Sequence, residues 1–138
     1  NMKYWLMKTE PGNWSWDDQV KKGVEHWDGV RNHQAANNMK AMALGDRIFF
    51  YHSVKEKCIV GIVEVAKLYY PDHTDPTGKF GMVDVKTVEP FKTPVTLSEI
   101  KADERLADML LVRHSRLSVS PVDAKAWKII CKMGGIKP

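Results

Sequence analysis

The chain has 138 residues, of which 43% are hydrophobic and 28% charged, and its formal net charge is +4. A chain of this length and composition can bury its own core, so we expect one domain over residues 1–138 that needs no disulfides. No apolar run approaches the roughly 20 residues that cross a bilayer, which argues against a membrane protein. The first residues lack the apolar core of a signal peptide, and Asn1, ahead of Met2, is expected to be an expression remnant.

Three further features of the composition bear on function. Cys58 and Cys131 have no metal or redox spacing and stand among apolar neighbours, which predicts buried free thiols and a cytoplasmic protein. The small positive charge favours polyanionic partners mildly, and no run of five basic residues occurs. Tryptophan is distributed unusually, since four of the five lie in the first 27 residues.

The first half of the chain is expected to contain two strand–helix transitions and a hairpin. Ser15 can cap a helix that carries Asp17 and Asp18 at its positive end. Gly45 suits the left-handed position after a second helix. The expected elements are a strand over 3–9, a helix from Ser15 to Gly23, a helix from Asn32 to Leu44, and paired strands over 47–53 and 58–68.

The second half is expected to add one strand and several short helices. After a loop over 70–81, residues 82–88 alternate apolar and polar as a half-buried strand does. Thr96 to Glu99 form a capping box, and Pro121 suits the first turn of a last helix. We also expect a helical stretch over 104–110 and an extended piece over 116–120. Hairpins with helices at their ends predict an α+β fold, and no Gly-rich loop indicates a nucleotide cofactor.

Trp27 is the aromatic residue most suited to ligand contact. It stands in a polar loop over 25–32, where an exposed ring can stack a flat base. Trp5, inside a strand, is expected to fill the core. Trp14 and Trp16 flank a helix cap and are expected to pack over its first turn.

Polar side chains near this loop offer base and phosphate contacts. Asn32 can read a base edge or cap the following helix, and Arg31 offers a planar fork for a phosphate or carbonyl. Near the end of the chain, Arg116 could meet a phosphate and Ser118 a base or sugar. A surface turn held by side-chain hydrogen bonds would explain the same residues.

The sequence predicts no catalytic and no metal site. The histidines match no zinc spacing, and neither a Gly-x-Ser-x-Gly elbow nor a His-Glu-x-x-His helix is present. His52 could act as a base only if Asp46 or Glu64 lay beside it in space. Residues 72–75 could hold a metal loosely, but a solvated turn is the stronger interpretation.

Eight blocks along the chain resemble the EVE domain family in family order. They are KYWLMKTEP at 3–11, WSW at 14–16, WDGVRN at 27–32, GDRIFFYHS at 45–53, GIVEV at 61–65, DPT at 75–77, VDV at 83–85 and SRLSV at 115–119. The resemblance implies a PUA-like fold, a small twisted β-barrel flanked by helices, related to YTH and ASCH domains. It also implies binding of modified bases, foremost methylated cytosine, in DNA or RNA.

The resemblance also suggests which residues form the site. By likeness to YTH domains, Trp27 would be one wall of an aromatic cage, with Asp28 beside it. Phe80 stands where many relatives carry a larger aromatic residue and is a candidate for the second wall. The residues implied to line or border the cleft are Lys8, Thr9, Glu10, Asn32, Ser53 and Arg116.

Three functions therefore stand as hypotheses. The preferred one is a non-catalytic binding module for modified nucleobases, without cofactor. The second is an enzyme that acts on nucleic acid or nucleotides, with His52 as its base. The third is a protein-interaction domain, which would present a broad apolar patch rather than a deep slot.

Overall fold

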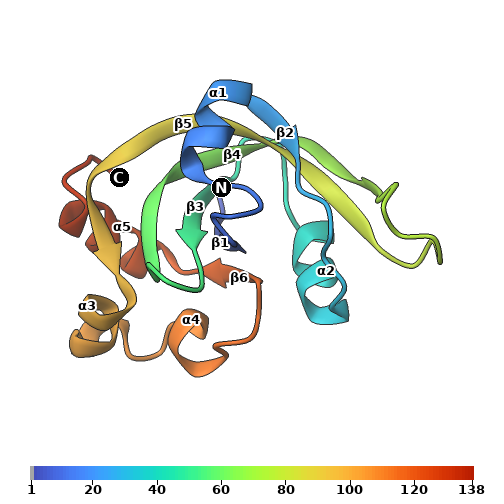
Figure 1. Cartoon of the computed structure of the whole chain (residues 1–138). Coiled ribbons are helices and arrows are strands. Elements are labelled where there is room, and N and C mark those ends of the chain that lie inside the picture. Colours follow the sequence, from blue (N-terminus) through green and yellow to red (C-terminus); the bar gives the residue numbers. More distant parts are fainter. Residues whose placement is uncertain (1) are drawn as a thin grey trace.

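Within residues 2–138, which the computed structural model describes, six strands form one sheet in the order β2-β5-β4-β3-β1-β6. β1 runs parallel to β3, and the other neighbouring pairs are antiparallel. The long strands β4 and β5 arch over β1, β3 and β6, so the sheet is twisted like a barrel without closing (Figure 1). The strands are β1 Tyr4–Thr9, β2 Val24–His26, β3 Arg47–His52, β4 Cys58–Pro71, β5 Gly81–Thr96 and β6 Val119–Val122.

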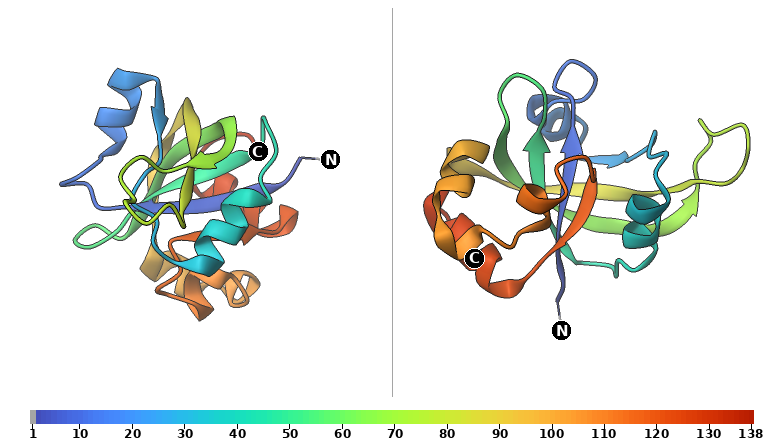
Figure 2. Two further views of the ribbon diagram at one scale, coloured as in Figure 1. Left: turned by 90° about the vertical axis from the view of Figure 1, so that its right-hand side faces the viewer. Right: turned by 90° about the horizontal axis from the view of Figure 1, so that it is seen from below.

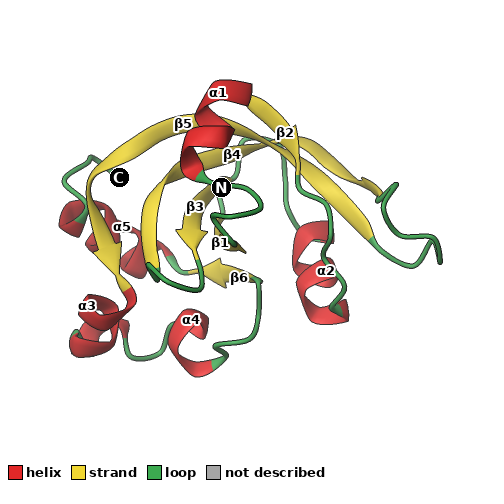
Figure 3. Ribbon diagram, in the orientation of Figure 1, coloured by secondary structure: helices red, strands yellow, loops and turns green. Residues whose placement is uncertain are grey.

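Helices lie around this sheet, as the colouring by secondary structure shows (Figure 3). Three short helices within residues 97–113 lie at one end of the sheet together with the last helix of the chain, and the helix over residues 33–40 lies at the other end. The loop that joins β4 to β5 extends away from the body of the sheet (Figure 2). The helices are α1 Trp16–Lys22, α2 His33–Lys40, α3 Leu97–Ala102, the 3₁₀ helix η1 Glu104–Leu106, α4 Leu110–Arg113 and α5 Ala124–Met133. Asn1, the expected expression remnant, lies outside the described residues.

The two faces of the sheet carry separate apolar clusters. Along β1, Trp5 and Met7 join one cluster and Leu6 joins the other, because successive side chains of a strand point to opposite faces. In the second cluster the rings of Phe49 and Trp127 stack at 3.8 Å between centroids. The first cluster contains Trp27 and therefore supports the loop in which a binding residue was expected.

The local signals of the sequence are largely confirmed. Ser15 caps α1 and forms a reciprocal box with Asp18, and Thr96 does the same with Glu99 at α3. The predicted strands over 3–9, 47–53 and 58–68 are present as β1, β3 and β4. These signals are short-range, so the local sequence is enough to determine them.

Three boundaries in the middle of the chain differ from the prediction. The first part of the expected polar loop is the edge strand β2, which pairs with residues 84–86 of β5. The second helix ends at Lys40 rather than Leu44, because the carboxylate of Asp46 accepts from the amide of Ala43 and holds a turn there. β5 continues to Thr96 through Pro90, which lies beside a register shift opposite Gly61; proline is tolerated at such irregularities.

The end of the chain also differs. Pro121 was expected in the first turn of the last helix, but it lies in the edge strand β6 opposite Trp5. Asp123 caps α5 instead and accepts from the amide of Ala126 at 2.7 Å. The prediction of one helical stretch over 104–110 is wrong. The extended backbone of Met109 separates η1 from α4, which begins at Leu110.

Candidate functional site

A cavity of about 500 Å³ opens where β1 ends. Its walls come from three segments: the end of β1 with the turn after it, the residue preceding the cap of α1, and β2 with the loop that follows. The lining residues are Lys8, Thr9, Glu10, Asn13, Trp14, Glu25, His26, Trp27, Asp28 and Gly29. The structure thus brings together Lys8, Thr9, Glu10, Trp27 and Asp28 of the predicted site residues.

Trp27 is less exposed than the sequence suggested. Its side chain is 8% exposed, and its ring meets Phe50 edge to face at 5.5 Å. The backbone amide of Trp27 donates to the carbonyl of Val83 at 2.8 Å. The ring is therefore fixed in the core, and only its remaining surface can face a ligand.

Trp14 is a cavity residue that the sequence interpretation missed. Its indole N–H donates to the side-chain oxygen of the buried Gln19 at 2.9 Å. Its carbonyl accepts from the hydroxyl of Thr9 at 2.8 Å. These bonds hold a half-buried ring at the cavity, whereas Trp16 turns into the core against Gly61. The signal was a Trp just outside a helix cap, a position that packing over the first turn explained equally well.

The polar lining is predominantly acidic. Glu10, Glu25 and Asp28 contribute carboxylates, and Lys8 is the lysine among the lining residues. Burial, and secondarily the charge of Lys57, lowers the pKa of the Lys8 ammonium. Such a cavity can hold a flat group against aromatic surface and accept hydrogen bonds from its amino groups. It disfavours a phosphate inside, because like charges repel.

Arg31 and Phe80 lie outside this cavity. The Arg31 guanidinium donates to the carboxylate of Asp72 at 3.0 Å and to the hydroxyl of Thr74 at 2.9 Å. It also lies 6.0 Å from the centre of the Phe80 ring, which packs against His33 at 4.9 Å. In this structure Phe80 thus contacts Arg31 and His33 and is not among the residues of the cavity wall.

The remaining predicted residues support or border the site. Asn32 caps α2 by accepting from the amide of Ala35 at 2.9 Å. The hydroxyl of Ser53 donates to the carbonyl of Thr9. The carbonyl of Ser118 accepts from the backbone amide of Lys8. Arg116 is exposed and lines a separate hollow of about 360 Å³ with Asn32, Gln34 and residues 113–117.

His52 does not lie beside either of the carboxylates considered for it, Asp46 and Glu64. Its Nε2 accepts from the backbone amide of Trp16 at 3.0 Å, and burial lowers its pKa. In the register of β3 and β4, Glu64 lies opposite Arg47, at the end of the strand pair far from His52. Asp46 immediately precedes Arg47 and lies at the same end. The two expected carboxylate partners of His52 are therefore wrong.

No helix in residues 2–138 has both the length and the apolar character needed to span a membrane.

Comparison with solved structures identifies the class of fold. An ASCH protein from Zymomonas mobilis superposes with a TM-score of 0.59 at 13% identity, over 96% of each chain, which is a likeness of fold alone. The twisted sheet and its helices are thus an α+β, PUA-like fold, as expected. Residues 3–133 match the family model of the EVE domain, and the chain belongs to this family.

Relatives extend over almost the whole chain. A protein of Rhodopseudomonas palustris, solved by NMR, is 58% identical with a TM-score of 0.91, over 97% of this chain and 94% of that one. Thymocyte nuclear protein 1 of Gallus gallus is 35% identical over 98% of this chain and 70% of its own length. A crystal structure of the human THYN1 protein in complex with 5-methylcytosine-containing DNA is 33% identical, with a TM-score of 0.92 and 99% of each chain covered.

Proposed function

We propose that this domain binds a modified nucleobase, foremost a methylated cytosine in DNA or RNA, in the cavity at the end of β1. The observation that carries the proposal is the combination of Trp14 and Trp27 with the carboxylates of Glu10, Glu25 and Asp28 in one cavity. A flat base would lie against the indole surface. Its amino group would donate to a carboxylate.

The chemistry of cytosine fits these walls. The exocyclic amine of cytosine is a donor that Glu and Asp accept from. Stacking of a base on an aromatic side chain is worth about 1–3 kcal/mol. A methyl group buried against the indoles adds about 0.8 kcal/mol, which is roughly a fourfold preference over the unmodified base. The human relative, whose structure contains 5-methylcytosine DNA, supports the same class of ligand.

A base can enter such a cavity only after it leaves the duplex stack or from a single strand. The phosphates would then remain outside the acidic cavity. A loop over residues 114–118 lies beside it, with Arg116 exposed, because the ammonium of Lys8 in the cavity wall donates to the carbonyl of Ser115. We propose that this loop meets the backbone while the cavity holds the base.

We propose no catalytic role for the domain. The lone-pair nitrogen of His52 is engaged by the amide of Trp16, so this histidine is poorly placed to act as a base. Cleavage of an oligonucleotide that His52→Ala abolishes would contradict this part of the proposal.

Because Cys58 and Cys131 are buried free thiols, a reducing compartment suits the chain, and we propose the cytoplasm.

A binding screen tests the proposal. Fluorescent oligonucleotides with one 5-methylcytosine or one cytosine at the same position, as DNA and RNA, single- and double-stranded, are titrated at one stated salt concentration. We expect the methylated form of at least one type to bind about fourfold or more tightly than its plain counterpart. Equal affinity throughout the screen would refute recognition of a methylated base.

A further inference from the structure

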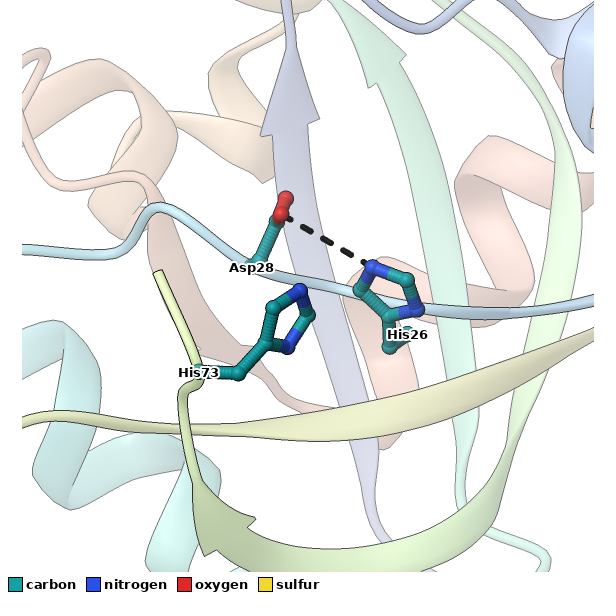
Figure 4. Close-up of side chains that lie close together, drawn as sticks. All are labelled: His26, Asp28 and His73. Atoms are coloured by element: carbon teal, nitrogen blue, oxygen red, sulfur yellow. Dashed lines mark ion pairs between the residues drawn. The ribbon is translucent and has the colours of Figure 1, made fainter. Parts of the chain in front are cut away.

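Three side chains with metal-binding atoms converge beside the cavity, and two of them, His26 and Asp28, belong to its wall. They are His26 of β2, Asp28 of the loop after it, and His73 of the loop between β4 and β5 (Figure 4). One donor atom from each lies within 4.8 Å of the other two. We propose that these residues form a binding site for a divalent transition-metal ion of the zinc class. The proposed base recognition requires no metal, so this site goes beyond it.

The ligand set selects the class of ion. Two imidazoles and one carboxylate suit zinc and its neighbours, whereas magnesium and calcium prefer oxygen ligands. Zinc bonds to nitrogen and oxygen are about 2.0–2.2 Å long, so tetrahedral donors lie roughly 3.4 Å apart. Nε2 of His26 is 3.7 Å from Oδ2 of Asp28, and the rings of His26 and His73 are 5.0 Å apart at 75°. Small side-chain rotations would therefore close the site.

Glu25 already orients His26 for this role. Its Oε1 lies 2.8 Å from Nδ1 of His26 and also accepts from the backbone amide of His26 at 3.0 Å. A metal-binding histidine commonly donates its other ring N–H to a carboxylate, which fixes the ring and raises its basicity. With Nδ1 facing Glu25, the lone pair of Nε2 is on the side of Asp28.

A buried carboxylate holds the two ligand-bearing loops together. The side chain of Asp72 is fully buried. It accepts from the amide of Gly29 at 2.9 Å and from Arg31 at 3.0 Å. Asp72 directly precedes His73, and Gly29 directly follows Asp28. The segments are thus connected before an ion arrives, which reduces the entropy lost on binding.

Hydrogen bonds within residues 72–75, for which a solvated turn was predicted, indicate which of these side chains can bind an ion. Asp72 and Asp75 are engaged by amides and hydroxyls of their own loop, so His73 is the residue left to bind an ion. A second cluster, His52 with Glu56 and Cys58, is less suitable. Nε2 of His52 is engaged by Trp16, and burial raises the pKa of the Cys58 thiol, which disfavours the thiolate.

Calorimetric titration of the untagged full chain with Zn²⁺ tests the proposal. We expect one ion per chain, with an affinity that excess Mg²⁺ leaves unchanged. His73→Ala should weaken binding by more than tenfold, and Glu25→Gln by about 10–100-fold, the usual effect of losing an orienting carboxylate. His114→Ala removes an exposed histidine outside the cluster and should leave the affinity unchanged.

Circular dichroism of each variant confirms that it is folded, and the absorption spectrum of bound Co²⁺ gives a second measurement of the ligand set. The wild-type spectrum should change in His73→Ala and persist in His114→Ala. Absence of stoichiometric binding, or equal losses in His73→Ala and His114→Ala, would overturn the site. Neither result would affect the base-binding proposal, which the oligonucleotide screen tests in metal-free buffer.

Discussion

The ammonium group of Lys8 donates a 2.6 Å hydrogen bond to the backbone carbonyl of Ser115. Lys8 lines the cavity, and Ser115 lies in the loop over residues 114–118, beside Arg116. This bond joins the proposed base site to the surface proposed to meet phosphates. The two surfaces carry different chemistry, and substitutions can therefore separate their contributions.

Arg116→Ala should change salt dependence without changing base preference. If Arg116 contacts one phosphate, its loss flattens the slope of log affinity against log salt by about one unit on duplex DNA. Methylated and plain oligonucleotides should weaken equally, because phosphate contacts do not identify the base. Titrations at several salt concentrations measure both quantities. Lost discrimination at an unchanged slope would show that Arg116 contacts the base.

Trp14→Ala and Trp27→Ala should differ in their effects. Trp27 is packed against Phe50 in the core, so its truncation should lower the free energy of unfolding by about 3–5 kcal/mol. Trp14 is half-buried, and its truncation should mainly weaken base binding, by about 1–3 kcal/mol. Urea unfolding and oligonucleotide titration measure the two effects. A folded Trp14→Ala protein with wild-type affinity would remove Trp14 from the site.

The loop between β4 and β5 should be sensitive to acid through Asp75. A hydrogen bond from the Thr77 hydroxyl lowers the pKa of Asp75 to about 2, together with hydrogen bonds from the backbone amides of Phe80 and Thr77. An unfolded Asp titrates near pH 4, so the stabilisation is complete above about pH 4 and is lost as the pH falls towards 2. Asp75→Asn should therefore lower the urea midpoint more at pH 7 than at pH 3. An equal effect at both pH values would contradict the assigned bonds.

Gly61→Ala tests how closely Trp16 packs on the sheet. A Cβ at position 61 would lie 2.5 Å from the Trp16 ring, so the ring would have to move. We expect destabilisation by about 1–3 kcal/mol, as for overpacked cores. Gly12→Ala is a control, because an added Cβ there meets nothing within 4 Å. Equal urea midpoints for the Gly61→Ala and wild-type proteins would contradict this packing.

The sequence was a good guide to several features that depend on local signals. The caps at Ser15 and Thr96 and the alternation over residues 82–88 of β5 depend on neighbours within a few residues. The blocks that resemble the EVE family extended this to the PUA-like fold. Strand β2 escaped detection because three residues are too few to show a period, and its place depends on pairing with Val85.

The site was harder to predict because its side chains are placed by distant partners. Arg31 looked free for a ligand, yet Asp72, 41 positions away, binds it. His73 looked like part of a solvated turn, but the fold brings it to His26. No spacing along the chain shows either contact, since each depends on how the fold places the β4–β5 loop beside the segment that contains β2 and the loop after it.

The central claim is that the cavity holds the modified base, and the indole N–H signals of the tryptophans test it most directly. Trp14 and Trp27 line the cavity, whereas Trp127 is buried in the cluster on the opposite face of the sheet. The ¹⁵N-labelled protein is titrated with a single-stranded oligonucleotide that contains one 5-methylcytosine, and then with the plain oligonucleotide. We predict that the chemical shifts of the Trp14 and Trp27 signals change and that the shift of the Trp127 signal does not. The plain oligonucleotide should require about a fourfold higher concentration for the same change. Unmoved Trp14 and Trp27 signals at saturating oligonucleotide would contradict the account.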